Sequence, residues 1–238
     1  MNLIIDIGNT QIKFALFDAN QIVNKDVGDV KDFQKFIKEK NIKYTLISSV
    51  SKSREIEKVL KKNKLEFIHL DSNLNLPINN HYATPKTLGD DRLANVVGAQ
   101  FLFPNQNVLT IDAGTCIKFD AVSRNGEYKG GAISPGLWMR FKALNHFTDA
   151  LPLVEPKSID FFIGNSSENS ILSGVVNGTV QEIEGVITQY QSIYENLTVI
   201  LTGGDASFFD NELKSNIFVE SNLTLIGLNE ILRYNTLT

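Results

Sequence analysis

The chain has 238 residues, a formal net charge of −4 and a sequence pI of about 5.5. This length suits one large domain or two of about 100 residues each, and either can bury a core. The acidic balance gives no support for nucleic acid as a partner. The one cysteine, Cys116, excludes an intrachain disulfide, and no apolar run is long enough to span a membrane. Since the N-terminus also lacks a cleavable leader, we expect a cytoplasmic protein.

The first half reads as strands and helices followed by a long polar loop. Apolar patterns and turn signals predict strands at 2–8, 11–18, 21–28, 44–50 and 65–70, and helices at 30–41, 51–63 and 89–102. Residues 71–88 contain two prolines and no clear period, which predicts a loop of a length that is often functional.

The second half repeats this plan. We expect strands at 107–113, 116–123, 127–134, 198–202 and 217–220, and helices at 137–145, 166–194, 205–212 and 223–234, with 147–164 irregular. The order of elements predicts an α/β fold with mixed sheets. The repetition favours two domains, at 1–105 and 106–238.

One sequence pattern occurs twice. Residues 3–14 and 109–119 align once Asn9 is removed, and each has an apolar run, an Asp, a Gly turn bearing a hydroxyl and a second β-rich run. Each copy predicts a hairpin with a carboxylate at its tip, Asp6 in the first and Asp112 in the second. Two copies in one chain favour a site for a phosphate chain and its cation.

The first copy shows what such a tip offers. Asp6 is a hard oxygen ligand suited to Mg²⁺, while backbone N–H groups, the Asn9 amide and the Thr10 hydroxyl are donors for phosphate oxygens. Gly8 permits close backbone approach, and Lys13 could reach the same anion. The alternative is an ordinary hairpin with an Asp-initiated turn and a surface lysine.

Other segments allow two interpretations each. Asp90 or Asp91 could cap the helix that begins at Gly89, or Asp91 beside Arg92 could form a base next to a clamp for an anionic substrate. On this segment alone the cap is favoured. The glycine-rich stretches 130–136 and 202–206 suit either a ligand or a tight turn.

Together these segments resemble the type III pantothenate kinases, a family of the acetate kinase/Hsp70/actin-like ATPase superfamily. The matching blocks occur in family order and span almost the whole chain: Asp6-x-Gly8-Asn9-Thr10-x-x-Lys13, Gly89-x-Asp91-Arg92-x-x-Asn95, Asp112-x-Gly114-Thr115, Gly130-Gly131-x-Ile133-x-Pro135-Gly136 and Thr202-Gly203-Gly204. The resemblance implies two ribonuclease H-like domains of the actin-like ATPase type, each a mixed β-sheet flanked by helices, related by internal duplication.

The resemblance also implies an activity and a set of site residues. It implies ATP-dependent phosphorylation of pantothenate to 4'-phosphopantothenate, the first step of coenzyme A synthesis, with Asp91 as general base. ATP would be bound by Asp6, Ile7, Gly8, Asn9, Thr10, Gln11, Ile12, Lys13 and Thr115, and pantothenate by Tyr82, Gly89, Asp90, Asp91, Arg92 and Thr179. Mg²⁺ would lie at Asp6, through water, and a monovalent cation (K⁺ or NH₄⁺) at Asp112. A homodimer is implied, with neither nucleic acid nor membrane as partner.

The second hairpin departs from the family pattern. The family usually has Asp-x-Gly-Thr-Ala-x-Thr-x-Asp, whereas this chain has Cys116 for the Ala and Lys118 for the second Thr, and keeps Asp120. Lys118 either points to solvent, which is the simpler expectation, or partly replaces the monovalent cation. Two rival functions remain: a kinase for another hydroxy acid or sugar (or a phosphatase), and a non-catalytic nucleotide-binding regulator of the same fold.

Overall fold

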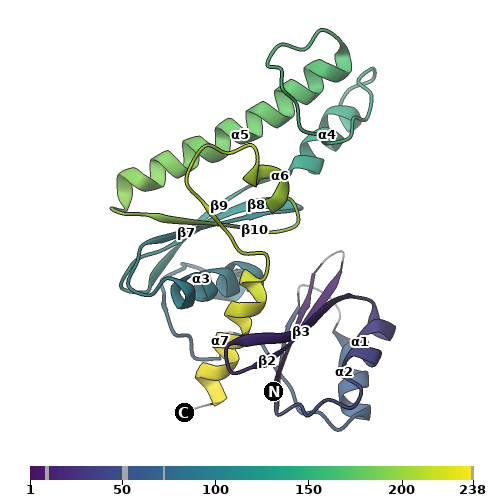
Figure 1. Cartoon of the computed structure of the whole chain (residues 1–238), viewed down its shortest axis with the longest axis vertical. Coiled ribbons are helices and arrows are strands. Elements are labelled where there is room, and N and C mark those ends of the chain that lie inside the picture. The colour runs from purple at the N-terminus through teal and green to yellow at the C-terminus, as the bar shows by residue number, and fades with distance from the viewer. Residues whose placement is uncertain (9–10, 50–52, 72, 237–238) are drawn as a thin grey trace. The chain divides into compact units, whose positions relative to one another are not determined.

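The computed structural model describes residues 1–8, 11–49, 53–71 and 73–236. The chain forms two compact units, shown in Figure 1: the first contains Met1–Pro104, Gly126–Lys129 and Asn222–Thr238, and the second contains Asn105–Asn125 and Gly130–Ser221. These units differ from a division at 105/106, because the C-terminal segment clusters with the first unit. The two contiguous domains stay a prediction.

The first unit is built on a five-stranded sheet. Its strands are β1 (Asn2–Ile7), β2 (Ile12–Asp18), β3 (Gln21–Gly28), β4 (Tyr44–Ser49) and β5 (Ile68–His69), in the order β3-β2-β1-β4-β5. The pairs β1–β2 and β2–β3 are antiparallel, whereas β1–β4 and β4–β5 are parallel. The helices are α1 (Val30–Phe36), α2 (Arg54–Lys62), α3 (Asp90–Leu102) and α7 (Leu223–Thr236), with the short β6 (Asn79–Asn80) and a 3₁₀ turn at Pro85–Thr87.

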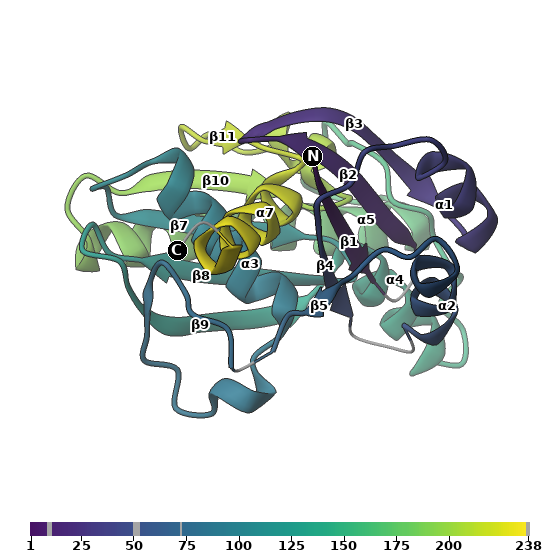
Figure 2. The ribbon, with the colours of Figure 1, turned by 90° about the horizontal axis from the view of Figure 1, so that it is seen from below.

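Both faces of this sheet carry helices. Leu3, Ile5 and Ile7 alternate along β1 and pack with residues of α1 and α2 in one apolar core. Figure 2 shows α1 and α2 together beside this sheet. On the other face α7 contacts β1 and β4, and α3 packs against α7. The α3–α7 approach is so close that a Cβ on Gly98 would lie 2.7 Å from the Leu223 carbonyl oxygen.

The second unit repeats the sheet. Its strands are β7 (Val108–Ala113), β8 (Cys116–Val122), β9 (Glu127–Pro135), β10 (Thr198–Thr202) and β11 (Phe218–Val219), in the order β11-β10-β7-β8-β9. Its helices are α4 (Leu137–His146), α5 (Ser167–Ile193) and α6 (Ala206–Asp210). The first residues of β9 cluster with the first unit, where they pair in parallel with β6.

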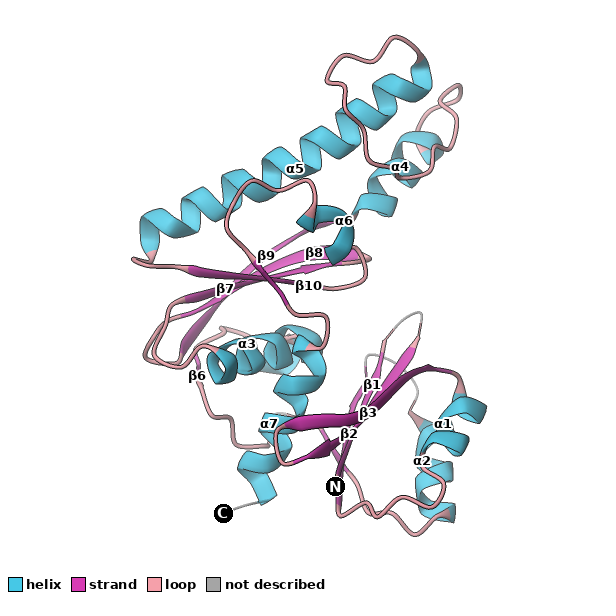
Figure 3. Cartoon of the chain, viewed as in Figure 1, coloured by secondary structure: helices cyan, strands magenta, loops and turns pink. Residues whose placement is uncertain are grey.

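The strand orders of the two units confirm the predicted duplication. Read from the antiparallel edge, β3-β2-β1-β4-β5 corresponds strand by strand to β9-β8-β7-β10-β11. In the second unit, Leu109, Ile111 and Ala113 of β7 alternate into a core with Ile171 and Val175 of α5. Figure 3 shows α5 running along one face of this sheet. The predicted α/β class, with two mixed sheets flanked by helices, is therefore confirmed.

Three predicted elements are shorter or more ordered than expected. The helix expected over 30–41 ends at Phe36, because Glu39 takes a left-handed φ of 60°. The strand expected over 65–70 is reduced to Ile68–His69, because the Leu65 N–H donates to the Leu60 carbonyl and so belongs to the end of α2. The loop expected over 71–88 contains β6 and the 3₁₀ turn. None of the helices in the described part of the chain is long and apolar enough to cross a membrane.

Candidate active site

Asp6 lies near the end of β1, on the sheet face opposite α1 and α2. Ile5 and Ile7 point into the core on that side, and the two-residue period of a strand turns Asp6 to the other face. The Ser48 hydroxyl of β4 donates to Asp6 Oδ1 at 3.3 Å. Lys13 is the residue directly opposite Asp6 on β2. The predicted carboxylate is therefore half-buried, with a lysine as its cross-strand partner.

The base of the first hairpin turn is described, and its tip is not. The Gly8 N–H donates to the Gln11 carbonyl at 3.1 Å, and Ile12 follows as the first residue of β2. Gln11 is exposed, whereas Ile12 is half-buried. Asn9 and Thr10, both predicted to bind phosphate, lie outside the described residues. The backbone hydrogen bond between Gly8 and Gln11 therefore closes the hairpin at the glycine from which the sequence predicted a turn.

Two adjacent carboxylates occupy the first turn of α3. Gly89 is the N-cap residue, without a side-chain cap. Asp91 Oδ1 accepts the Arg92 N–H at 2.8 Å, and a Cβ on Gly89 would lie 2.7 Å from that same oxygen. Asp90 Oδ2 accepts the Ser49 N–H from the end of β4 at 3.4 Å. Neither Asp is therefore the N-cap residue, although both lie where the helix dipole favours negative charge.

The two carboxylates have different surroundings. Burial raises the pKa of Asp90 above its ordinary value, the Ser49 N–H partly opposes this rise, and the negative charge of Asp91 adds to it. Asp90 is tied to β4, whereas the carboxylate of Asp91 folds back over the Gly89 backbone. Different environments for neighbouring acids allow them different roles.

Arg92 presents a buried guanidinium beside these acids. Arg92 is only 5% exposed. The guanidinium carbon lies 5.3 Å from the centre of the Tyr82 ring, and Nη1 donates to the Tyr82 hydroxyl at 3.4 Å. A guanidinium offers several N–H donors to a carboxylate or phosphate, so this position beside a ring hydroxyl is suited to an anionic group.

The loop before α3 is held so that Tyr82 reaches Arg92. The Tyr82 ring stacks on Tyr128 of β9, with 6.3 Å between ring centres and an interplanar angle of 8°. Asn80 Oδ1 accepts the Tyr82 N–H at 3.0 Å, and the His81 N–H donates to the Tyr128 carbonyl at 2.8 Å. The structure brings Tyr82 and Arg92 together, as predicted, and adds Tyr128, which sequence reasoning missed. Tyr128 reads as an ordinary core residue in the sequence, and only strand pairing places it under Tyr82.

The second hairpin carries its own charge pair. Asp112 of β7 and Lys118 of β8 are directly opposite in register, and Lys118 Nζ lies 2.7 Å from Asp112 Oδ2. Their side chains are 15% and 20% exposed. The expectation that Lys118 points to solvent is therefore wrong. Thr115, predicted to contact ATP, is exposed at the hairpin tip.

Glycines allow two turns to approach this tip. Gly203 follows β10 with a φ of +98°, and a Cβ there would lie 2.2 Å from the Ala113 carbonyl oxygen and 2.6 Å from Asp112 Oδ1. A Cβ on Gly136, before α4, would lie 2.0 Å from the Gly114 carbonyl oxygen. Backbone thus packs against the second hairpin from two sides, which leaves main-chain groups near the predicted phosphate position.

Thr179, predicted to bind pantothenate, lies in the middle of α5. Its residue is fully buried, and its hydroxyl donates to the Val175 carbonyl at 2.7 Å. In this structure the Thr179 hydroxyl therefore donates its hydrogen bond within α5.

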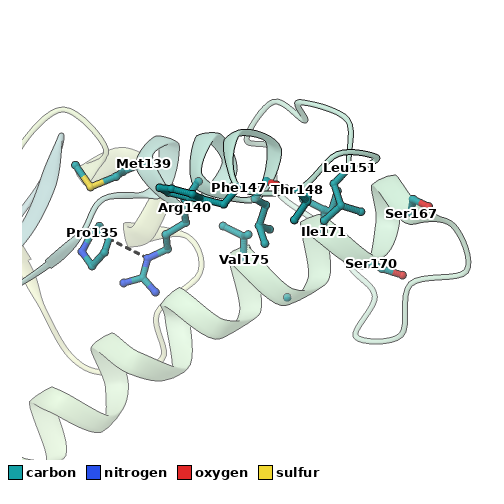
Figure 4. Close-up of a pocket in the computed structure, with 13 residues that line it drawn as sticks. Pro135, Met139, Arg140, Phe147, Thr148, Leu151, Ser167, Ser170, Ile171 and Val175 are labelled. Carbon is teal, nitrogen blue, oxygen red and sulfur yellow. Dashed lines mark hydrogen bonds between the residues drawn. The ribbon is translucent and has the colours of Figure 1, made fainter.

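An apolar pocket lies between α4 and α5 within the second unit. It has a volume of about 1130 Å³, and its lining includes Met139, Leu144, Phe147, Ile171 and Val175. Figure 4 shows Phe147, Ile171 and Val175 between the two helices, with Arg140 at one end donating to the Pro135 carbonyl. Arg140 also pairs with Glu182 of α5 at 2.6 Å, which ties the helices together beside the pocket.

Comparisons with solved structures define the fold class. A conserved Campylobacter jejuni protein assigned to the Baf family of transcriptional activators matches with a TM-score of 0.64 and 22% identity, over 99% of this chain and 100% of that one. Glucokinase from an Antarctic psychrotroph matches with a TM-score of 0.51 and 13% identity, over 98% of both chains. The duplicated sheets and these likenesses place the chain in the actin-like ATPase fold class.

Sequence relatives identify the family. The model of the family described as type III pantothenate kinase matches residues 2–189. The chain is 48% identical to the type III pantothenate kinase of Christiangramia forsetii, over 99% of both chains, and 42% identical to that of Cytophaga hutchinsonii, over 99% of this chain and 100% of the relative. The chain belongs to the type III pantothenate kinase family. It is therefore a phosphotransferase, which removes the non-catalytic regulator and the phosphatase as interpretations.

Proposed function

We propose that, in the phosphorylation of pantothenate by this chain, Asp91 accepts the proton of the acceptor hydroxyl while the γ-phosphoryl group of ATP is transferred to it. The product, 4'-phosphopantothenate, is the first intermediate of coenzyme A synthesis. Asp91 lies at the start of α3 with its carboxylate held over Gly89 by the Arg92 N–H. A base fixed in this way orients the attacking hydroxyl, and positioning of this kind is one of the two main contributions to phosphoryl transfer, beside electrostatic stabilisation.

The observation that carries this proposal is the buried guanidinium of Arg92 next to Asp91. Pantothenate has a carboxylate and, at its other end, a primary hydroxyl. A guanidinium binds a carboxylate through paired N–H donors, and the Tyr82 ring and hydroxyl hold Arg92 in place for this contact. We propose that Arg92 and Tyr82 bind the carboxylate end, with Gly89 and Asp90 lining the same substrate position.

The residues proposed to bind the ATP phosphates come from the two hairpins: the segment 6–13 and Thr115. Among the described residues, no group of three or more His, Cys, Asp or Glu side chains could hold a metal ion. Mg²⁺ keeps several waters and takes other ligands from the phosphates, so one carboxylate can be its contact with the protein. Asp6, half-buried with a serine donor on one oxygen, would hold the ion through water. When bound, the ion neutralises phosphate charge.

The proposed monovalent cation has a less suitable position. The resemblance assigns it to Asp112, where Lys118 already places an ammonium 2.7 Å from one carboxylate oxygen. A second cation about 4 Å from that ammonium would be repelled by roughly 4 kcal/mol at an effective dielectric constant near 20. We therefore derive no catalytic step from a K⁺ or NH₄⁺ ion at Asp112.

We further propose a homodimer that uses the second unit. Phe147, Phe162 and Ile163 are 80%, 76% and 85% exposed, in or next to the irregular segment between α4 and α5. A Cβ on Gly174 or Gly178 of α5 would contact nothing within 4 Å, so this helix face is open to a second copy. Thr179 belongs to the same helix, and its proposed contact with pantothenate depends on this assembly. Sedimentation velocity of the wild type tests the dimer, and a monomer at micromolar concentration would contradict it.

The kinase proposal is tested by ADP release with and without pantothenate. We expect turnover to depend on pantothenate and Asp91→Asn to lower kcat by about 10²- to 10⁴-fold. Asp26→Asn is a matched control, because Asp26 Oδ1 likewise accepts the N–H of its following residue at 2.8 Å but is exposed on β3. Full activity of Asp91→Asn would overturn the role of Asp91.

The remaining alternative substrate is another hydroxy acid or a sugar. We expect Arg92→Met to raise the KM for pantothenate much more than the KM for ATP, because it removes a carboxylate contact. Faster turnover of a neutral sugar than of pantothenate would favour the alternative. Since the reaction uses cellular ATP and the chain has one free cysteine, we propose that the enzyme acts in the cytoplasm.

A further inference from the structure

The charge pair of the second hairpin lies on the sheet face away from the unit's main core. Ile111 and Ala113 of β7 and Ile117 and Phe119 of β8 pack into the core with α5. The two-residue period of each strand therefore turns Asp112, Lys118 and Asp120 to the opposite face. There Lys118 is directly across from Asp112, and its ammonium contacts the carboxylate at 2.7 Å.

A second carboxylate belongs to the same sheet face. Asp120 is two residues beyond Lys118 on β8, so it is the diagonal neighbour of Asp112, and it is only 1% exposed. Negative charges on one sheet face favour a positive charge on the same face. Lys118 is the lysine that the strand register places beside both.

The first hairpin has the same register but lacks the second carboxylate. Asp6 and Lys13 are directly opposite, as Asp112 and Lys118 are. The position that corresponds to Asp120 is Ala15, which carries no charge. The lysine of the second copy therefore has one more carboxylate on its sheet face than the lysine of the first.

We infer that Lys118 supplies, from within the chain, the positive charge that a monovalent cation would provide at Asp112, so that neither MgATP binding nor turnover requires added K⁺ or NH₄⁺. This inference rests on the proposed function, because it assigns Asp112 to the phosphate-binding hairpin. Lys118 acts through Asp112 and is a positioning residue. Its ammonium occupies Asp112 Oδ2, while Oδ1 faces the backbone of Gly203. An alkali ion, which needs several oxygen ligands, would lose one of them to the ammonium.

Cation dependence is the direct test. Pantothenate-dependent turnover and MgATP affinity are measured in KCl, NH₄Cl and tetramethylammonium chloride at constant ionic strength. For the wild type we expect both quantities to change by less than about twofold among the three salts. For Lys118→Thr, which restores the usual family residue, we expect a loss of about tenfold or more in tetramethylammonium and recovery in K⁺ or NH₄⁺. Lys118→Arg retains the charge and is expected to stay independent of K⁺.

Two controls separate this role from a structural one. Lys157→Thr breaks another Lys–carboxylate pair of the second unit, with Glu168 at 3.1 Å, whose side chains are more than half exposed. It is expected to leave the cation response unchanged. Thermal unfolding confirms that each variant is folded, and activation of Lys118→Thr by K⁺ is an effect that loss of structure alone does not produce.

The outcomes are distinguishable. A wild type that requires K⁺ or NH₄⁺ for MgATP binding or turnover overturns the inference, as does a Lys118→Thr variant that works equally well in all three salts. If MgATP binding shows the expected pattern but turnover is independent of pantothenate, the proposed function fails and the inference about Lys118 holds.

Discussion

Gly203 is the position where the structure predicts the clearest effect of a single methyl group. Its φ of +98° is one that residues with a Cβ rarely adopt. A Cβ would also lie 2.2 Å from the Ala113 carbonyl oxygen and 2.6 Å from Asp112 Oδ1, well inside the 3.4–4 Å of ordinary contact. At Gly204, the next residue, a Cβ would meet nothing within 4 Å. The two glycines therefore form a matched pair with opposite expectations.

The cost of Gly203→Ala has two sources. The left-handed backbone costs a residue with a Cβ about 1–2 kcal/mol, and forcing a methyl group into packed backbone costs about 1–3 kcal/mol more. We expect the free energy of unfolding of the second unit to fall by about 2–5 kcal/mol, which corresponds to a Tm lower by roughly 4–20 °C. Because the colliding oxygens belong to the second hairpin, we also expect a higher KM for ATP.

Urea unfolding, followed by circular dichroism, and ATP-dependent kinetics measure both effects. Gly204→Ala is expected to change the free energy of unfolding by less than about 0.5 kcal/mol, as an uncrowded surface substitution does. The reasoning fails if Gly203→Ala is as stable as the wild type, or if the two variants are destabilised equally. A stable Gly203→Ala variant would mean that the turn relaxes away from Ala113 without cost.

Three further predictions concern stability. Gly227→Ala should lower the free energy of unfolding of the first unit by about 1–3 kcal/mol in urea, because a Cβ would lie 1.8 Å from the Ala94 carbonyl oxygen of α3. Glu184→Gln should cost about 1–3 kcal/mol at pH 7. Burial alone would raise the pKa of Glu184, but hydrogen bonds, chiefly from the Ser215 hydroxyl, lower this pKa below 4.5. The stabilisation is therefore lost as the pH falls through the lowered pKa. Urea titrations of the wild type and of Glu184→Gln should give the same free energy of unfolding in acid. Burial raises the pKa of Asp90, so just above pH 3.8 the folded state binds more protons than the unfolded state. The wild type should therefore lose stability relative to Asp90→Asn as the pH rises through that window. Plots of the free energy of unfolding against pH that stay parallel for the two proteins would contradict this.

Local sequence patterns predicted most helices and strands. They failed where helix ends or pairing between distant strands determine the bounds of an element. Ser166 accepts the Asn169 N–H and starts α5 as the capping pattern indicates. Residue 65, by contrast, is apolar and reads as strand, but its N–H completes the end of α2. The pairing of β6 with β9 joins segments almost fifty residues apart, and no local pattern in 71–88 predicts it.

The candidate site shows the same limit. The sequence repeat predicted two hairpins, each with a carboxylate near its tip, and the structure places a lysine directly opposite each carboxylate. The direction of the Lys118 side chain did not follow, since a lysine at a strand position is compatible with solvent or with a carboxylate. The contact between Lys118 and Asp112 in the structure shows which of these two directions the side chain takes. Tyr128 was missed for a related reason. Its contact with Tyr82 depends on the short parallel pairing of β6 with β9, which no local sequence pattern predicts.

The two hairpins share a register that places a lysine opposite a carboxylate, and they differ in the residues around the repeat. In the second copy, Gly203 and Gly136 bring backbone against residues 113–115, and Asp120 adds a buried carboxylate. In the first copy, Ser48 of β4 approaches the carboxylate with a hydroxyl, and a neutral Ala15 replaces the second acid. A lysine at position 118 therefore makes the second copy chemically more like the first while its surroundings remain different. Because these differences lie in neighbouring strands and turns, substitutions at Asp120 should alter the cation response more than the corresponding substitutions at Ala15.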